Sequence, residues 1–187
     1  MITLGNKNCE LRRSFVNLLN ICSIDELRVN LQGVYFNSGE NTLVVTDGFI
    51  LLEVKAEYYG FTEDDMNFLA DKTIHKDQLK TIFKNYDKIV VKEDCFVCSS
   101  KKAKNVTFFF ESINSKFPNY SHITKPVNFI EQDAMAFDFL KAAKIQKAIP
   151  NTSSLKVCFT GSNKVMTVVS GNPDYTQFMA YLMPCML

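Results

Sequence analysis

Apolar residues recur along this chain at two spacings, and each change of spacing marks the limit of an expected helix or strand. Between residues 10 and 21 they recur every three or four positions, which predicts an amphipathic helix. Strands are predicted at 31–36 and 42–55, on either side of a polar hairpin turn at 37–41. The buried face of the helix is expected to carry Leu11, Phe15, Leu18, Leu19 and Cys22.

The same order of elements returns twice. The second passage predicts an extended start at 72–74, a helix over 76–85, and strands at 88–92, 95–99 and 105–112. The third predicts an extended start at 134–137, a helix over 139–149 that stops before Pro150, and strands at 154–159, 164–169 and 177–182. Between the first two passages, the acidic stretch 59–71 with Glu63, Asp64 and Asp65 is expected to be a solvated loop rather than a metal site.

Three passages of this kind form an internal repeat of βαβββ units, here called the first, second and third units. The repeat predicts an α+β fold with antiparallel sheets and helices on one face. We expect residues 1–118 to form a domain of two units, 119–133 a linker, and 134–187 a half domain of one unit.

Composition narrows the class of protein. The 187 residues are 47% hydrophobic and 22% charged, as in a folded globular protein, and the net charge of +1 excludes a globally basic nucleic-acid binder. No stretch approaches the roughly 20 apolar residues that cross a bilayer. Residues 1–7 lack the apolar core of a signal peptide, so we expect a cytoplasmic protein with reduced cysteines and no membrane partner.

Catalytic and metal-binding patterns are weak. Cys95 and Cys98 have a zinc-like spacing, but a structural zinc needs four ligands and the only histidines are His75 and His122. No phosphate-binding loop or nucleophile elbow is present. We therefore expect neither an enzyme nor a metal or other cofactor.

Cations concentrate on the expected helices. The first carries Arg12 and Arg13, and the other two carry lysines at spacings of four and three. Charged outer faces are usual for amphipathic helices, but here the acidic residues gather in loops instead. Positive helix faces suit sequence-independent contact with DNA phosphates. The candidate DNA-backbone residues are Arg12, Arg13, Lys76, Lys80, Lys84, Lys141, Lys144 and Lys147.

Several short strings support a more specific prediction. Leu31-Gln32-Gly33 stands fifteen positions before the turn Thr46-Asp47-Gly48, Phe117-Pro118-Asn119-Tyr120 follows the second unit, and an apolar Met183-Pro184 string comes at the last strand. Each string by itself can be explained as an ordinary turn or a strand packed on the core. Together they make the chain resemble the bacterial sliding clamp, the ring-shaped processivity factor of the replicative DNA polymerase.

The resemblance implies a non-catalytic DNA clamp that binds double-stranded DNA independently of sequence. It also implies a hydrophobic cleft that captures short linear peptides of polymerases, the clamp loader or repair proteins. Two departures, Phe49-Ile50 after the turn and Met186 before the last leucine, make the cleft more apolar than the family's. The cleft residues would be Leu31, Thr46, Gly48, Leu51, Pro118, Ile123, Met183, Pro184 and Leu187.

Length separates this chain from the family, whose members have three full domains. Three units per chain make a ring of the usual size only as a homo-oligomer of more chains, such as four. The chain could instead dimerise by completing its half domain, or bind peptides as a regulatory module that does not encircle DNA. The other alternative to a clamp-like protein is an unrelated α+β enzyme or small-molecule binder.

Overall fold

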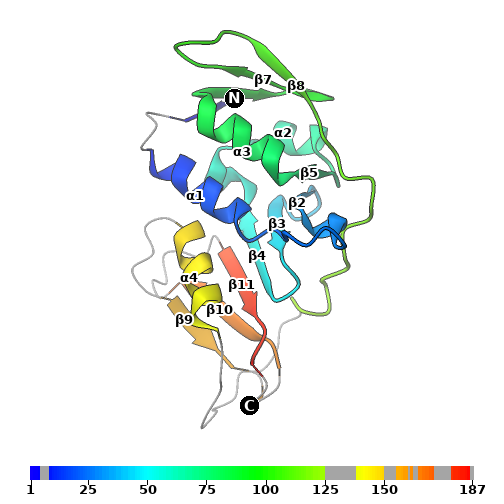
Figure 1. The fold of residues 1–187 in the computed structure, drawn as a ribbon, viewed down its shortest axis with the longest axis vertical. Helices are drawn as coiled ribbons and strands as arrows, with labels where there is room; N and C mark the ends of the chain where they lie inside the picture. Colours follow the sequence, from blue (N-terminus) through cyan, green and yellow to red (C-terminus); the bar gives the residue numbers. More distant parts are fainter. Residues whose placement is uncertain are drawn as a thin grey trace.

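Two antiparallel sheets form the framework of the computed structural model, which describes residues 1–4, 9–124, 138–149, 155–159, 161, 164–170 and 178–185 (Figure 1). The seven-stranded sheet has the order β5-β2-β3-β4-β11-β10-β9, and the four-stranded sheet has the order β1-β6-β7-β8. The strands are β1 Ile2–Thr3, β2 Gly33–Asn37, β3 Thr42–Thr46, β4 Ile50–Lys55, β5 Thr73–His75, β6 Lys88–Val91, β7 Cys95–Ser99, β8 Val106–Phe109, β9 Leu155–Cys158, β10 Met166–Ser170 and β11 Phe178–Leu182.

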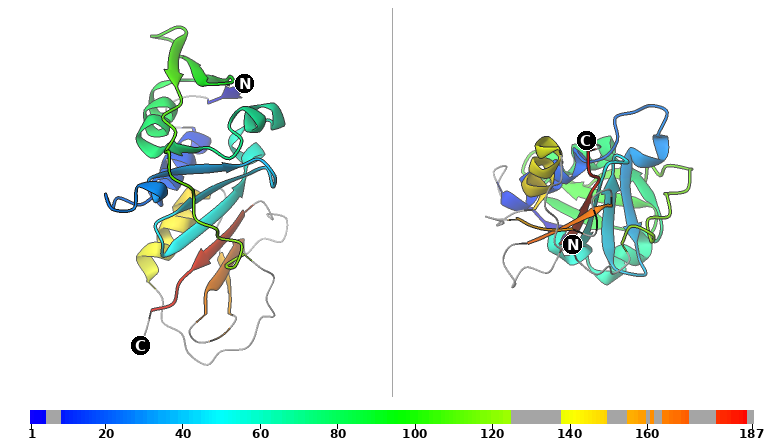
Figure 2. Two further views of the ribbon diagram at one scale, coloured as in Figure 1. Left: turned by 90° about the vertical axis from the view of Figure 1, so that its right-hand side faces the viewer. Right: turned by 90° about the horizontal axis from the view of Figure 1, so that it is seen from below.

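Three of the helices lie side by side on one side of the sheets, with α1 in contact with both of the others (Figures 1 and 2). These are α1 Glu10–Leu19, α3 Lys76–Asn85 and α4 Phe139–Ala148. The helix α2 Glu63–Phe68 lies apart from them, and Val29–Leu31 (η1) and Ala56–Tyr59 (η2) are short 3₁₀ helices. The predicted α+β class, with antiparallel sheets and repeated βαβββ units, is confirmed.

The prediction of a solvated acidic loop at 59–71 is wrong, because this stretch contains α2. Thr62 and Asp65 form a capping box: the Thr62 hydroxyl accepts from the Asp65 N–H at 3.2 Å, and the Asp65 carboxylate accepts from the Thr62 N–H at 2.9 Å. Met66 anchors the helix in the core. The acidic residues therefore occupy the first turn of a helix, where negative charge is favoured.

The first two units exchange their first strands. β1 of the first unit pairs with β6 of the second, and β5 of the second unit pairs with β2 of the first. Their helices share one core, in which the rings of Phe15 on α1 and Phe83 on α3 stack with centroids 3.6 Å apart. The described residues of the first two units are thus held together by sheet pairing and by helix packing.

The third unit joins the first through a five-residue ladder, in which β11 pairs with β4 from Phe178–Val54 to Leu182–Ile50. On the helix side, the Tyr59 hydroxyl donates to the Ala148 carbonyl at 3.0 Å. The extended start expected at 134–137 and most of the predicted linker, 119–133, lie outside the described residues. The division of the chain into domains remains a prediction.

Candidate functional site

One face of the seven-stranded sheet carries part of the predicted cleft, Thr46 and Leu51. Strand register places Thr46, Leu51 and Tyr181 in a row across β3, β4 and β11. A second row runs from Tyr35 through Val44 and Glu53 to Met179. Because side chains alternate between the two faces of a strand, these residues share one face, here called the outer face.

The segment 113–124 runs back along the outer face after β8 (Figure 2). Phe117 stacks on Tyr35 with ring centroids 4.8 Å apart, and it packs in one cluster with Val44, Leu51 and Tyr181. The string Phe117-Pro118-Asn119-Tyr120, here called the Phe117 clasp, therefore holds this segment against the sheet.

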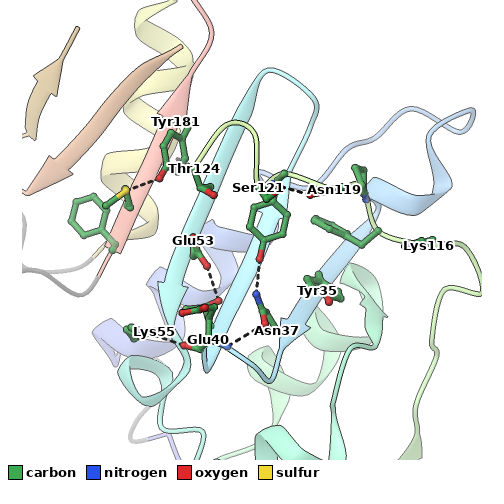
Figure 3. A pocket seen from close by; sticks show the side chains of 16 residues that line it. Tyr35, Asn37, Glu40, Glu53, Lys55, Lys116, Asn119, Ser121, Thr124 and Tyr181 are labelled. Atoms are coloured by element: carbon green, nitrogen blue, oxygen red, sulfur yellow. Dashed lines mark hydrogen bonds between the residues drawn. The ribbon is translucent and has the colours of Figure 1, made fainter. Parts of the chain in front are cut away.

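Between the segment and the sheet lies a cavity of about 690 Å³ (Figure 3). Its walls combine aromatic and polar side chains. They are formed by Tyr35, Asn37, Glu40, Thr42, Glu53, Lys55, Lys116, Phe117, Pro118, Asn119, Tyr120, Ser121, Thr124, Phe178, Met179 and Tyr181.

Hydrogen bonds order several of the polar groups that line the cavity. The Asn37 amide donates to the Tyr120 hydroxyl at 2.8 Å, and the Thr42 hydroxyl donates to the Glu53 carboxylate at 2.9 Å (Figure 3). Burial raises the pKa of Tyr181 to about 12, with a further contribution from the negative charge of Glu53. The Tyr35 and Tyr181 hydroxyls already donate to Asp71 and to the Met179 sulfur, whereas the Tyr120 hydroxyl accepts from Asn37 and can donate to a ligand.

The Thr46-Asp47-Gly48 turn forms the other end of the outer face. The Thr46 hydroxyl donates to the Ile50 carbonyl at 2.6 Å and accepts from the Gly48 N–H at 3.0 Å. Gly48 has φ +91°, a left-handed conformation that favours glycine, and a Cβ there would lie 2.6 Å from the Arg28 guanidinium. The turn is thus held by its own hydrogen bonds, and the Arg28 side chain packs closely against Gly48.

The chain after β11 reaches this turn, because the Met183 N–H donates to the Phe49 carbonyl at 3.1 Å. Leu31, on the other side, would lie 3.9 Å from a Cβ at Gly48. Met183 and Ile123 are exposed, whereas Leu31 is buried. The structure therefore gathers Leu31, Gly48 and Met183 around the turn. Pro118 lines the cavity, next to the cluster that contains Leu51. Pro184 is half-buried, and Leu187 lies outside the described residues.

The grouping of Arg28, Phe49 and Lys141 beside the turn was not predicted from the sequence, which named Lys141 only as a DNA-backbone candidate and Phe49 only as a departure from the family. Phe49 is half exposed, with the Lys141 ammonium 3.8 Å above its ring centroid and the Arg28 guanidinium 5.9 Å away. Nothing local signals this grouping, since Arg28, Phe49 and Lys141 come from three separate elements. By contrast, the position of Glu53 two residues after Leu51 could have placed it on the outer face.

The predicted cationic residues divide into two groups. Arg13, Lys84, Lys144 and Lys147 are exposed on α1, α3 and α4, and Lys80 is half-buried. Lys76 donates to the carbonyl of Ser23, and Lys141 is engaged with Phe49. The exposed group lies on the side of the molecule formed by the three helices.

The prediction that Arg12 lies on the outer side of its helix is wrong. Arg12 is only 4% exposed, and its guanidinium donates to the carbonyls of Phe83 and Tyr86 and pairs with Asp87 at 3.0 Å. It joins the end of α3 to α1 and is unavailable to a phosphate.

The Cys95-Cys98 pair lies in β7 with both side chains buried. Burial raises the pKa of Cys98 to about 12, which disfavours the thiolate that metal or redox chemistry needs. In the part of the chain that the structure describes, no helix is long and apolar enough to span a membrane.

No protein-family model matches the chain, and no curated protein matches it in sequence. Its structure nevertheless defines a class: this is the fold of the bacterial sliding clamp. Among similar solved structures, the DNA polymerase III beta chain from Streptococcus pneumoniae TIGR4 has a TM-score of 0.67 and 16% identity, over 95% of this chain and 63% of that chain. The beta subunit from Thermotoga maritima has a TM-score of 0.65 and 13% identity, over 95% and 64%.

A third similar structure is the Helicobacter pylori beta clamp bound to a DNA ligase peptide, with a TM-score of 0.66 and 14% identity, over 95% of this chain and 63% of that chain. The chain thus spans less than two thirds of the length of these clamps. The resemblance first suggested by short strings is confirmed at the level of the fold.

Proposed function

We propose that this protein is a non-catalytic, sliding-clamp-like protein of the cytoplasm that tethers replication or repair proteins to double-stranded DNA. The helix side would face the DNA, and the outer face would capture peptides. The observation that carries the proposal is the placement of α3, α1 and α4 in one row, with Arg13, Lys84, Lys144 and Lys147 exposed, on a clamp fold. A row of exposed cations on rigid helices suits phosphate contact without base readout.

The outer face supports the second part of the proposal. A peptide can place an apolar anchor beside Leu51 and Pro118 and another near Met183, on a surface that is already ordered by the Thr46 turn and the Phe117 clasp. The adjoining cavity, with its tyrosines and Glu53, offers hydrogen bonds to the rest of the peptide. Capture would thus combine apolar anchors with polar positioning.

Replacing Lys144 and Lys147 by glutamate tests the DNA-facing side. Both residues are exposed on α4, so the fold should tolerate the change. We expect weaker binding to plain double-stranded DNA and a log affinity–log salt slope that is shallower by about two per chain in contact, because each lost phosphate contact removes about one released counterion. Fluorescence anisotropy over a salt series measures both quantities.

The matched control is Lys101→Glu with Lys102→Glu, which makes the same charge change at exposed positions between β7 and β8. This control should keep most of the native affinity and slope. Equal losses in the two double variants would show that net charge alone governs binding, and the assignment of the helix side would fail.

The alternative is a peptide-binding relative that does not encircle DNA. It is favoured by the use of Arg12 and Lys76 inside the fold, which removes two of the predicted phosphate contacts. This alternative predicts peptide capture that is insensitive to the Lys144 and Lys147 changes and independent of DNA.

A further inference from the structure

The cavity continues the outer face beyond the place proposed for the apolar anchors of a peptide. Glu53 comes two positions after Leu51 on β4, which places the two side chains on one face, about 7 Å apart. Phe49, whose carbonyl accepts from the Met183 N–H, comes two positions before Leu51. A peptide with one anchor near Met183 and another beside Leu51 therefore reaches Glu53 with its next residues.

The carboxylate of Glu53 is held in the wall of this cavity. Glu53 is half-buried, and its Oε1 atom accepts from the Thr42 hydroxyl at 2.9 Å (Figure 3). An ionised carboxylate has about four acceptor positions, so this bond leaves Glu53 able to accept from a ligand. The hydrogen bond with Thr42 also fixes where that acceptor lies.

Negative charge acts on the tyrosine hydroxyls of the cavity. Burial is the main cause of the raised pKa of Tyr120, and the hydrogen bond with Asn37 partly offsets it. The charges that act on this hydroxyl are those of three carboxylates, each of which raises its pKa further: Glu53, Glu40 and Asp71. The cavity therefore favours a positively charged ligand group over a negative one.

Two lysines, Lys55 and Lys116, also line the cavity. The Lys55 ammonium donates to the Glu40 carbonyl at 2.9 Å, and Lys116 is exposed on the segment 113–124. In the part of the chain that the structure describes, neither lysine forms an ion pair with Glu53. The charge of Glu53 is therefore available to a ligand.

The aromatic walls of the cavity suit the rest of a basic side chain. Tyr35, Phe117, Tyr120 and Tyr181 line the cavity together with Glu53. The aliphatic stem of a lysine or arginine packs on such rings, and its positive head is attracted to their faces. The volume of about 690 Å³ lies within the range of ligand pockets, so it can take a peptide side chain with its backbone.

We propose that this cavity selects a basic residue, lysine or arginine, in the peptide that the outer face captures, and that Glu53 determines this specificity. The basic residue lies just beyond the anchor that contacts Leu51, on the side away from Met183. This selection rests on the proposed peptide capture and adds the chemistry of the partner, which is an apolar motif flanked by a positive charge.

The test compares labelled peptides that share Leu and Phe anchors and differ at one position two residues beyond them. One peptide carries lysine there, and the other carries norleucine, which has the same carbon chain without the ammonium. Each pair is made with this position N-terminal and C-terminal to the anchors. In one of the two arrangements, the native protein should bind the lysine peptide about five to ten times more tightly, because a charge-assisted hydrogen bond forms. Fluorescence anisotropy measures both affinities.

Glu53→Gln should bring the ratio of the two affinities close to one. The change keeps an oxygen that can accept from Thr42, so the sheet should stay intact, but it removes the charge. Glu93→Gln, at an exposed position between β6 and β7, is the matched control and should keep the native ratio. Thermal unfolding of both variants verifies that each remains folded.

The salt dependence of the lysine preference gives a second readout on the native protein. Screening weakens the attraction between a charge on the peptide and a half-buried carboxylate, so the preference should fall as salt is raised. A preference that salt leaves unchanged overturns the role of the Glu53 charge, because shape alone would then select the side chain.

The outcomes separate this selection from peptide capture itself. Equal affinity of the native protein for the lysine and norleucine peptides, in both arrangements, overturns the selection and leaves the capture standing. So does a lysine preference that Glu53→Gln and Glu93→Gln change by the same factor. If no peptide with these anchors binds, the proposed capture fails, and the selection of a basic residue fails with it.

Discussion

At the scale of the residue, position within the tertiary structure decides what a cation does. Arg12 and Arg13 are neighbours on α1, yet Arg12 is buried between helices and Arg13 faces solvent. The guanidinium of Arg12 satisfies the carbonyls of Phe83 and Tyr86 where α3 ends, and these have no further helical partner. Adjacent residues of one type thus have different roles.

Arg12→Met should therefore be strongly destabilising. The change keeps the length of the side chain but leaves buried carbonyls without a donor, which costs about 2 to 3 kcal/mol of unfolding free energy. Arg13→Met, at the exposed neighbour, should change it by less than about 0.5 kcal/mol. Urea unfolding measures both, and equal effects would contradict the role assigned to Arg12.

At the scale of the element, the outer face depends on two segments that close it from opposite ends. The Thr46-Asp47-Gly48 turn and the chain after β11 meet through the Met183–Phe49 hydrogen bond, while the Phe117 clasp lies across β2. Gly48, Met183 and Phe117 lie outside the strands, so side-chain changes around them can alter binding without disturbing the strands.

Met183→Glu combined with Ile123→Glu should abolish peptide capture and leave the fold intact. Both side chains are exposed, at 43% and 37%, so their loss costs little stability, but two charges would occupy the apolar surface that a peptide anchor needs. The measurement is anisotropy of a labelled peptide with Leu and Phe anchors, alongside thermal unfolding. Phe109→Glu, at an exposed residue of the other sheet, is the control, and unchanged capture in the double variant would remove the cleft assignment.

At the scale of the whole molecule, encirclement of DNA depends on how the chains assemble. Each chain has three units, and the solved clamps that it resembles are longer, since it covers 63–64% of the compared chains. We expect encirclement to require several chains in one ring, such as four.

A closed ring predicts topological retention on DNA. The protein should stay on closed circular double-stranded DNA through a high-salt wash, because screening weakens phosphate contacts but does not open a ring. Cutting the circle with a restriction enzyme should release it. Gel filtration of the DNA before and after cutting is the measurement, and equal loss from both forms would favour the peptide-binding alternative that does not encircle DNA.

Local pattern was enough to predict most of the elements. The helices at α1, α3 and α4 and the meander strands follow from apolar spacing, because burying one face of each element requires a matching period. The helix α2 could also have been found, since Thr62 and Asp65 stand at capping-box spacing before the apolar Met66. The strings around Thr46, Phe117 and Met183 likewise identified the ends of the outer face.

Contacts between distant segments were decided only by the tertiary structure. The burial of Arg12, the grouping of Arg28 and Lys141 around Phe49, and the exchange of β1 and β5 all join residues far apart in the chain. Periodicity reports which face of an element is buried but not which element covers it. The strand order and helix packing make that choice, because several pairings would bury the same apolar faces and only one set satisfies the backbone and charged groups together.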